Sequence, residues 1–205
     1  QRKGLSGTAV WVKRGALWQL PPPDFDVEGR TTTVEFLTWI LVTVYTPNSQ
    51  CQGSDRHIYR VTEWDPQFRE YVNALQRRKP VLICGDFNVA RHDIDVYAPD
   101  EYRGLCAGFL DSERHRLEQL IGDGWTDSLR AVLPDVQKQY TFWDQKLPFK
   151  RKSNRGWRID YVFVPRAFRR QIRHAGTLPE VQGSDHCPCT LEFTTRRKLR
   201  IIDKK

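Results

Sequence analysis

Hydrophobic positions along this chain follow two kinds of spacing, which predict strands and helices in turn. Residues 7–13 and 32–47 are rich in β-branched and aromatic side chains, as is typical of strands, and the second stretch is long enough for two. Residues 80–88 hold a short apolar run followed by glycine, which predicts a buried central strand that ends in a loop. Alternation over residues 157–164 predicts another strand, and residues 189–195 predict the last one.

Two stretches have helical spacing instead. Apolar residues recur every three or four positions from residue 59 to 78, at Val61, Trp64, Phe68, Val72 and Leu75. Residues 111–121 place their leucines and isoleucine on one helical face, and the glycines of residues 122–124 end that helix. The chain has no repeats, so it is expected to form one α/β domain over residues 1–195, followed by a basic tail at 196–205.

Composition narrows the class of protein. The net charge of +8 favours a polyanionic partner. No apolar run approaches 18 residues and no secretory leader is recognisable, so a membrane protein is not expected. Five cysteines without a CxxC pair point to a reducing compartment, without a disulfide framework or structural zinc. The sequence contains no methionine and begins with Gln1, so it is expected to be a fragment or a processed form.

Polar side chains with catalytic potential stand at the ends of three predicted strands. Asp86 and Asn88 follow the apolar strand, and Asp160 lies within a strand where an unpaired acid would be costly. Asp185 and His186 are adjacent in the loop "GSDHCP", before the last strand. If these segments converge, they form a site for a hard cation and a phosphate. Each group also has a simpler explanation. Asp86 and Asn88 could form a turn, and Asp160 could belong to a structural ion pair. Asp185 and His186 could be solvated surface residues.

Four motifs in order resemble the exonuclease/endonuclease/phosphatase superfamily, and within it the apurinic/apyrimidinic endonucleases of the exonuclease III type. The resemblance covers residues 3–195. The motifs are "CGDFNVA" (84–90), "YTFW" (140–143), "NRGWRIDYVFV" (154–164) and "GSDHCP" (183–188). The first and last occur across the superfamily, whereas the middle two are specific to its DNA-repair branch.

The resemblance implies a fold and an activity. The fold is a four-layer α/β sandwich of two facing β-sheets flanked by helices, here without its N-terminal strands. The activity is metal-assisted hydrolysis of double-stranded DNA on the 5′ side of abasic sites, with Mg²⁺ or Mn²⁺ as cofactor. A 3′-phosphodiesterase or 3′–5′ exonuclease activity is compatible with the same family. We expect a monomer without membrane contact, in the nucleus or a mitochondrion of a eukaryote, or otherwise in the cytoplasm.

The same resemblance assigns catalytic roles by position. His186 contacts the scissile phosphate, and Asp160 orients its ring. Asp86 is a general base for the attacking water or protonates the leaving group, and both roles stay open. Asn88 holds the water or a phosphate oxygen, and Tyr45 donates a hydrogen bond to the phosphate.

Metal binding is where the chain departs from the resemblance. Asp185 is the implied metal neighbour, but the family's asparagine and principal glutamate ligand precede the "GLSG" segment and are not in this sequence. A single carboxylate is a poor Mg²⁺ site, so weak metal binding is expected. Cys51 and Cys106 also stand near positions where the family has an arginine and an asparagine that contact DNA. A catalytically impaired nucleic-acid-binding relative is therefore an alternative.

Contacts to DNA are implied for a second group of residues. Asn48 lies beside the DNA strand, and an apolar pocket for a sugar without its base is walled by Phe142, Trp157 and Ile159. The basic loop at 146–158, with Arg151 and Arg155, is predicted to bind phosphates, although it could also be a solvated loop. The pocket and the loop argue against the other alternative, a superfamily hydrolase of lipid or inositol phosphates.

Overall fold

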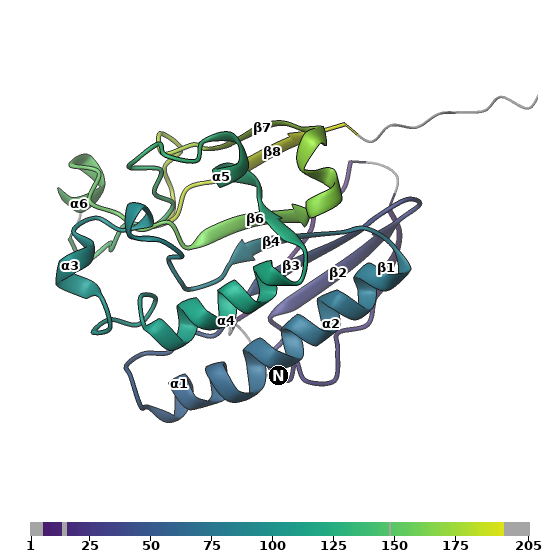
Figure 1. Ribbon diagram of the computed structural model, residues 1–205, viewed down its shortest axis with the longest axis horizontal. Coiled ribbons are helices and arrows are strands. Elements are labelled where there is room, and N and C mark those ends of the chain that lie inside the picture. The colour runs from purple at the N-terminus through teal and green to yellow at the C-terminus, as the bar shows by residue number, and fades with distance from the viewer. Residues whose placement is uncertain (1–5, 14–15, 148, 195–205) are drawn as a thin grey trace, which may run out of the picture.

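A six-stranded sheet and a two-stranded sheet form the framework of the protein, as a computed structural model shows for residues 6–13, 16–147 and 149–194 (Figure 1). The large sheet has the order β1-β2-β3-β4-β6-β5, and β7 pairs with β8 in the small one. The strands are β1 Ala16–Leu20, β2 Thr31–Phe36, β3 Ile40–Tyr45, β4 Val81–Asp86, β5 Trp125–Asp127, β6 Asp160–Pro165, β7 Ile172–Thr177 and β8 Cys189–Phe193. Within the large sheet, only the β3–β4 pairing is parallel.

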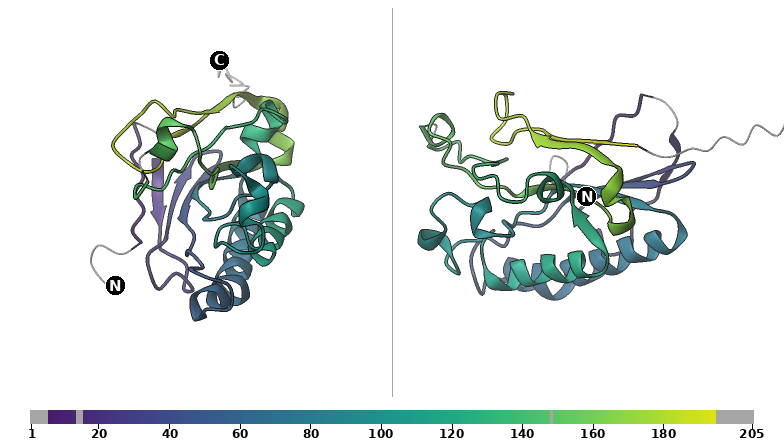
Figure 2. Two further views of the ribbon diagram at one scale, coloured as in Figure 1. Left: turned by 90° about the vertical axis from the view of Figure 1, so that its left-hand side faces the viewer. Right: turned by 45° about the horizontal axis from the view of Figure 1, so that its top comes forward.

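Two long helical segments cover one face of the large sheet, and the β7–β8 sheet lies toward the other (Figures 1 and 2). The first segment runs unbroken through α1 Asp55–Tyr59, the π-helical turn η1 Arg60–Trp64 and α2 Asp65–Arg78, and the second is α4 Asp111–Gly122. Shorter helices are η2 Asp93–Asp95, α3 Pro99–Tyr102, α5 Ser128–Val132, α6 Phe149–Lys152 and η3 Arg166–Gln171. None of the helices in the described ranges is both long and apolar enough to cross a bilayer.

The main core lies between the helices and the sheet. Strand β3 contributes Ile40, Val42 and Val44, and the helices contribute the apolar faces that their spacing predicted. Phe87 packs edge-to-face on Tyr161, with 5.7 Å between the ring centroids. Burial of these apolar surfaces is the main source of stability, and it also fixes the strand ends that carry the polar residues.

Most of the predicted elements are confirmed. The stretch at 32–47 corresponds to β2 and β3, although β2 begins one residue earlier. The helical spacing at 59–78 corresponds to η1 and α2, and that at 111–121 to α4. Strands β4 and β8 lie within their predicted stretches, and β6 extends one residue beyond its own. The fold class is therefore confirmed as mixed α/β with two sheets. The tail at 196–205 lies outside the described residues.

The strand predicted at residues 7–13 is wrong. No strand is assigned there, and the first strand is β1, which pairs with β2. Residues 7–13 reach β2 through side chains instead, because the Thr8 hydroxyl lies 2.7 Å from the Thr32 hydroxyl. Tryptophan favours strands, but the Trp11 side chain is 90% exposed and has no packing partner in the described structure. Strands β1, β5 and β7 were not predicted.

Candidate active site

Three adjacent strands each place one polar residue at the same level of the sheet. Tyr45 at the end of β3 pairs in register with Asp86 at the end of β4. Asp86 in turn pairs with Asp160, the first residue of antiparallel β6. Directly paired residues point to the same face of a sheet, so the three side chains form a row at its edge. The predicted convergence of the Asp86 and Asp160 strand ends is thus confirmed, and the hydrogen bond from His186 to Asp160 brings the third predicted segment to them.

The Asp86 carboxyl is held in an unusual electrostatic environment. Burial, followed by the charge of Asp160 across the strand pair, raises the pKa of Asp86 to about 7, although His186 opposes the shift. The backbone amide of Asn88 donates a 2.7 Å hydrogen bond to Asp86 Oδ1. A carboxyl with this pKa exchanges protons readily near neutral pH, which suits acid–base chemistry.

His186 and Asp160 form a hydrogen-bonded pair. His186 Nδ1 lies 2.8 Å from Asp160 Oδ2. Burial lowers the pKa of the imidazole, but the hydrogen bond and charge of Asp160, with Asp86 and Asp185 nearby, raise it to about 9. The ring is therefore positively charged at neutral pH, with Nε2 as its remaining donor. The Thr141 hydroxyl accepts the backbone amide of Asp160 at 3.2 Å, which fixes the strand end.

Asn88 is buried in a loop whose backbone is constrained. It has a φ of 47°, in the left-handed region, where asparagine is tolerated better than most residues. Its Nδ2 donates to the Thr46 carbonyl at 2.8 Å, and its Oδ1 accepts from Asn48 Nδ2 at 3.0 Å. Gly85 adopts a φ of 139°, and a Cβ there would lie 2.0 Å from the Val44 carbonyl oxygen. The "GDFN" motif thus requires its glycine as well as its polar residues.

Sequence reasoning missed the support for this loop. The buried Arg60 guanidinium donates to the carbonyls of Phe87 at 2.7 Å and Asn88 at 2.9 Å. It also contacts Glu113 at 3.1 Å, and that carboxylate accepts the backbone amide of Gly108 at 2.7 Å. The available signal in the sequence was Arg60 itself. It lies in a segment with helical spacing, and a charged residue on the buried face of a helix needs hydrogen-bonding partners.

Tyr45 is supported from a neighbouring loop. The Arg30 guanidinium lies 4.9 Å from the Tyr45 ring centroid and donates to the Tyr45 carbonyl at 2.9 Å. Glu28 binds Arg30 and Arg56, and hydrogen bonds from Arg56 and Arg30 outweigh burial and lower the pKa of Glu28 to about 2. The phenol remains 37% exposed, within reach of a ligand.

Tyr45, Asp86 and His186 line a cleft of about 520 Å³. The predicted apolar wall is present, because Phe142, Trp157 and Ile159 all line the cleft. Asn48, Asp185 and Cys106 line it too, as do two aromatic residues that the sequence reasoning missed, Tyr97 and Tyr102. The Tyr102 and Trp157 rings meet edge-on at 5.2 Å between centroids. A mixed aromatic and polar cleft of this size suits a sugar–phosphate unit.

The basic loop at 146–158 divides into surface and buried residues. Lys150 and Arg155 line the cleft, and the Arg155 guanidinium lies 5.1 Å from the Tyr97 ring centroid. Arg151 instead faces the loop that carries Asp185, and its contact with DNA stays a prediction. Arg158 was grouped with the DNA-binding cations, and this is wrong, because its side chain is 1% exposed.

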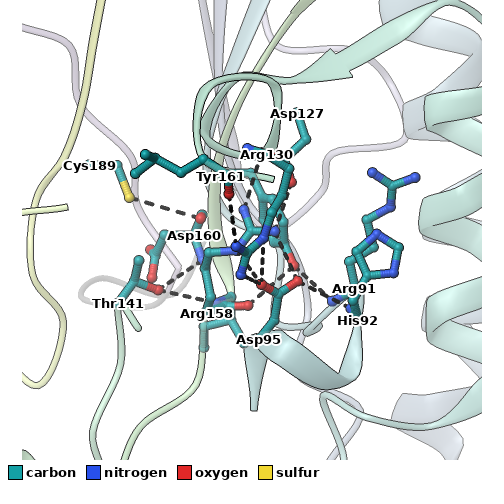
Figure 3. A network of polar contacts seen from close by, with 12 residues as sticks. Arg91, His92, Asp95, Asp127, Arg130, Thr141, Arg158, Asp160, Tyr161 and Cys189 are labelled. Atoms are coloured by element: carbon teal, nitrogen blue, oxygen red, sulfur yellow. Dashed lines mark hydrogen bonds and ion pairs between the residues drawn. The ribbon is translucent and has the colours of Figure 1, made fainter. Parts of the chain in front are cut away.

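Arg158 belongs to a buried ionic network behind the cleft (Figure 3). Its Nη2 donates to Asp95 at 2.9 Å and to Asp127 at 2.7 Å, and Arg130 also binds Asp95. The network joins η2, the start of α5 and the segment that leads into β6. It therefore holds the chain on either side of Arg158, where Trp157 and Ile159 wall the cleft.

The described residues do not form a complete metal site. They contain no group of three or more His, Cys, Asp or Glu side chains that could hold a metal ion. Asp185 borders the cleft, and its Oδ1 lies 3.3 Å from the Ser184 hydroxyl. A hard divalent cation prefers several carboxylate or carbonyl oxygens, so these residues alone do not fit one.

The architecture and the polar groups at its strand ends place the protein in a class, the hydrolytic nucleases of DNA repair. The chain belongs to the Endonuclease/Exonuclease/phosphatase family, which residues 1–186 match. It is 40% identical over 193 residues to an exodeoxyribonuclease of Bacillus subtilis, covering 93% of this chain and 75% of that protein.

Other relatives agree with this placement. The DNA repair nuclease APEX1 of Danio rerio is also 40% identical over 193 residues, and the chain spans 61% of its length. Among solved structures, the 3′ phosphatase NExo from Neisseria, bound to a product DNA hairpin, superimposes with a TM-score of 0.74 at 27% identity. That match covers 83% of this chain and 66% of the Neisseria chain.

Proposed function

We propose that this protein hydrolyses the phosphodiester on the 5′ side of abasic sites in double-stranded DNA. The observation that carries the proposal is the row of Tyr45, Asp86 and Asp160, with His186 bonded to Asp160, at the edge of an aromatic-walled cleft. The names of the relatives support the substrate class, because they include DNA repair and exodeoxyribonuclease functions.

Each of these residues has a separate role in hydrolysis. Charged His186 stabilises the negative charge that develops on the phosphate, and Asp160 keeps its ring oriented. Asp86 accepts a proton from the attacking water, which the Asn88 side chain helps to orient. The new bond joins the water oxygen to phosphorus, the bond to the 3′ oxygen breaks, and that oxygen takes a proton from solvent to become the 3′-hydroxyl. Tyr45 donates a hydrogen bond to a phosphate oxygen.

A divalent cation would contribute further charge stabilisation in such a reaction. Enzymes of this family are generally metal-dependent, and we propose Mg²⁺ or Mn²⁺, with Asp185 as its one contributor among the described residues. Because these residues do not complete a metal site, each step of the hydrolysis is assigned to a protein side chain.

The cleft provides the basis for recognising the lesion. A sugar without its base is small enough to enter the cleft that Phe142 and Trp157 line, whereas an intact nucleotide brings a base that must also be accommodated. Lys150 and Arg155 at the rim add phosphate contacts that are independent of sequence. We propose that the protein binds DNA as a monomer.

A substrate panel tests this proposal. The protein is incubated with Mg²⁺ and four substrates: an abasic duplex, the same duplex undamaged, a duplex ending in a 3′-phosphate, and an inositol phosphate. We expect cleavage of the abasic duplex to exceed cleavage of the undamaged one by at least about tenfold, equivalent to about 1.4 kcal/mol of discrimination. Faster turnover of the 3′-phosphate would support the activity named for the Neisseria relative, and turnover of inositol phosphate alone would refute the proposal.

The pH dependence of the rate tests the role of Asp86. As a general base, Asp86 must be deprotonated, and its pKa is raised to about 7 by burial and by Asp160. The single-turnover rate should therefore rise with pH through about 7, level off, and fall again near pH 9, where His186 loses its positive charge. In Asp86→Asn this rising limb should disappear along with most of the rate. A rate that falls through pH 7 would instead identify Asp86 as the acid that protonates the leaving group.

The salt dependence of DNA binding tests the lysines of α6. Lys150→Ala with Lys152→Ala should weaken duplex binding and reduce the slope of log affinity against log salt by roughly 0.9 for each lost phosphate contact. The matched control removes two exposed cations, one in η3 and one in β7, with Arg170→Ala and Arg173→Ala, and should keep the slope. An equal slope in both double variants would show that the α6 lysines are only solvated.

A further inference from the structure

Arg151 differs from the lysines on either side of it. Its Nη1 donates to the Ser184 carbonyl at 2.5 Å, and its Nη2 donates to the carbonyls of Val181 at 2.6 Å and Pro179 at 3.1 Å. The guanidinium also lies 4.7 Å from the centroid of the Trp143 ring. Both Nη groups are thus committed to the protein and Nε is buried without a partner among the described residues, whereas phosphate binding would need these donors to face outward.

The segment that Arg151 contacts is the loop at 179–186, which carries Asp185 and His186. Its outer residues are exposed, and Gly183 has a φ of 111°. Within the described ranges, the carbonyls of Pro179, Val181 and Ser184 have no hydrogen-bond donor other than Arg151. The inner end is held separately, because the Trp143 amide donates to the Asp185 carbonyl at 2.9 Å.

Trp143 completes a brace between α6 and this loop. Its indole Nε1 donates to Asn154 Oδ1 at 3.2 Å, and Asn154 follows α6 in the chain. One face of the indole supports the Arg151 guanidinium, while its backbone holds Asp185. The catalytic loop and the basic helix are therefore fastened to each other at two neighbouring points, Arg151 and Trp143.

We infer that Arg151 is a positioning residue, which holds the loop at 179–186 so that His186 meets both Asp160 and the scissile phosphate. The inference rests on the proposed function for its catalytic meaning. Only arginine fits this position, because a planar guanidinium can reach three carbonyls and stack on an indole, whereas a lysine ammonium is a single point of contact. Loss of the side chain should affect turnover, since small displacements of catalytic groups lower the rate strongly.

The test separates turnover from binding in the full protein. For Arg151→Ala, we expect the single-turnover rate on saturating abasic duplex to fall roughly 10- to 100-fold, as for a misplaced catalytic group. Duplex affinity should stay within about threefold, and the salt slope should not change, because no phosphate contact is lost. Arg151→Lys should keep the charge without restoring the rate. The control Arg170→Ala also removes one exposed guanidinium and should leave every value unchanged.

A second readout requires no DNA. Hydrogen exchange of the peptide spanning 179–188 should become faster in Arg151→Ala, but not in Arg170→Ala, because a loop without its anchor opens more often and exposes the hydrogen-bonded amides of Val181, His186 and Cys187. If the wild-type protein cleaves no abasic DNA, the proposed function fails, while faster exchange still supports the anchoring role. Unchanged exchange overturns the inference. A normal saturated rate with weaker, less salt-dependent binding also overturns it, and would make Arg151 a phosphate contact.

Discussion

His186→Asn is expected to keep the fold and bind abasic DNA within several-fold of the wild-type affinity, yet lose cleavage by roughly two orders of magnitude or more, the scale of one lost transition-state donor. The reason is that the charged imidazole, whose pKa is raised to about 9, interacts with the phosphate most strongly as negative charge develops. Single-turnover rates on an abasic duplex measure the effect. Near-normal cleavage would show that His186 has no catalytic role.

The partner of His186 supplies the matched comparison. Asp160→Asn should lose less than His186→Asn, because the ring stays but its 2.8 Å carboxylate partner becomes neutral. The double variant should lose less than the product of the two separate factors, since the residues act as a unit. Independent, multiplicative losses would show that the hydrogen bond between them has no catalytic role.

Asp95→Asn is expected to lower the free energy of unfolding by about 3–5 kcal/mol, the range for removing one partner of a buried ion pair. Asp95 is fully buried between Arg158 and Arg130, so neutralising it leaves two buried cations short of a counter-charge. The control Asp93→Asn, in the same turn, breaks ion pairs with Arg103 and Arg114 in which the Asp93 side chain is 49% exposed. That change should cost about 1 kcal/mol or less. Equal losses in urea unfolding would contradict a structural role for the network.

The ion pairs of Asp95 should also affect the stability of the fold at acid pH. Burial raises the pKa of Asp95, but Arg158 and Arg130 outweigh it and hold the value below the usual range for aspartate. A depressed pKa stabilises the fold above the unfolded-state value near 4, and this contribution disappears as the pH falls through the folded-state value. Asp95→Asn should therefore flatten the loss of stability below pH 4.

The strands that matter for the site were predictable because their signals are local. Residues 81–86 form an apolar run that stops at Asp86, and the alternation over 157–164 predicted the strand β6, which buries Tyr161 and Phe163 in the core. The "GSDHCP" motif marked the catalytic loop. Each prediction depended on a few neighbouring residues, and a buried sheet face specifies such patterns strongly.

What the sequence could not provide was pairing between distant segments. Nothing near Arg158 reveals that Asp95 and Asp127 will enclose it, so it was read as one more cation of a basic loop. The register that sets Asp86 opposite Asp160, and so raises the pKa of Asp86, likewise depends on the three-dimensional pairing of β4 with β6. Residues 7–13 show the opposite case, in which a local strand signal lacks a pairing partner.

The central claim is that a water molecule attacks phosphorus on the 5′ side of the abasic sugar. Cleavage in ¹⁸O-labelled water, followed by mass spectrometry of both product ends, tests it most directly. Attack by water with departure of the 3′ oxygen predicts one ¹⁸O atom in the 5′-phosphate of the abasic fragment and an unlabelled 3′-hydroxyl on the other. An unsaturated sugar at the 3′ end with no label in the phosphate would indicate elimination, and would contradict the account.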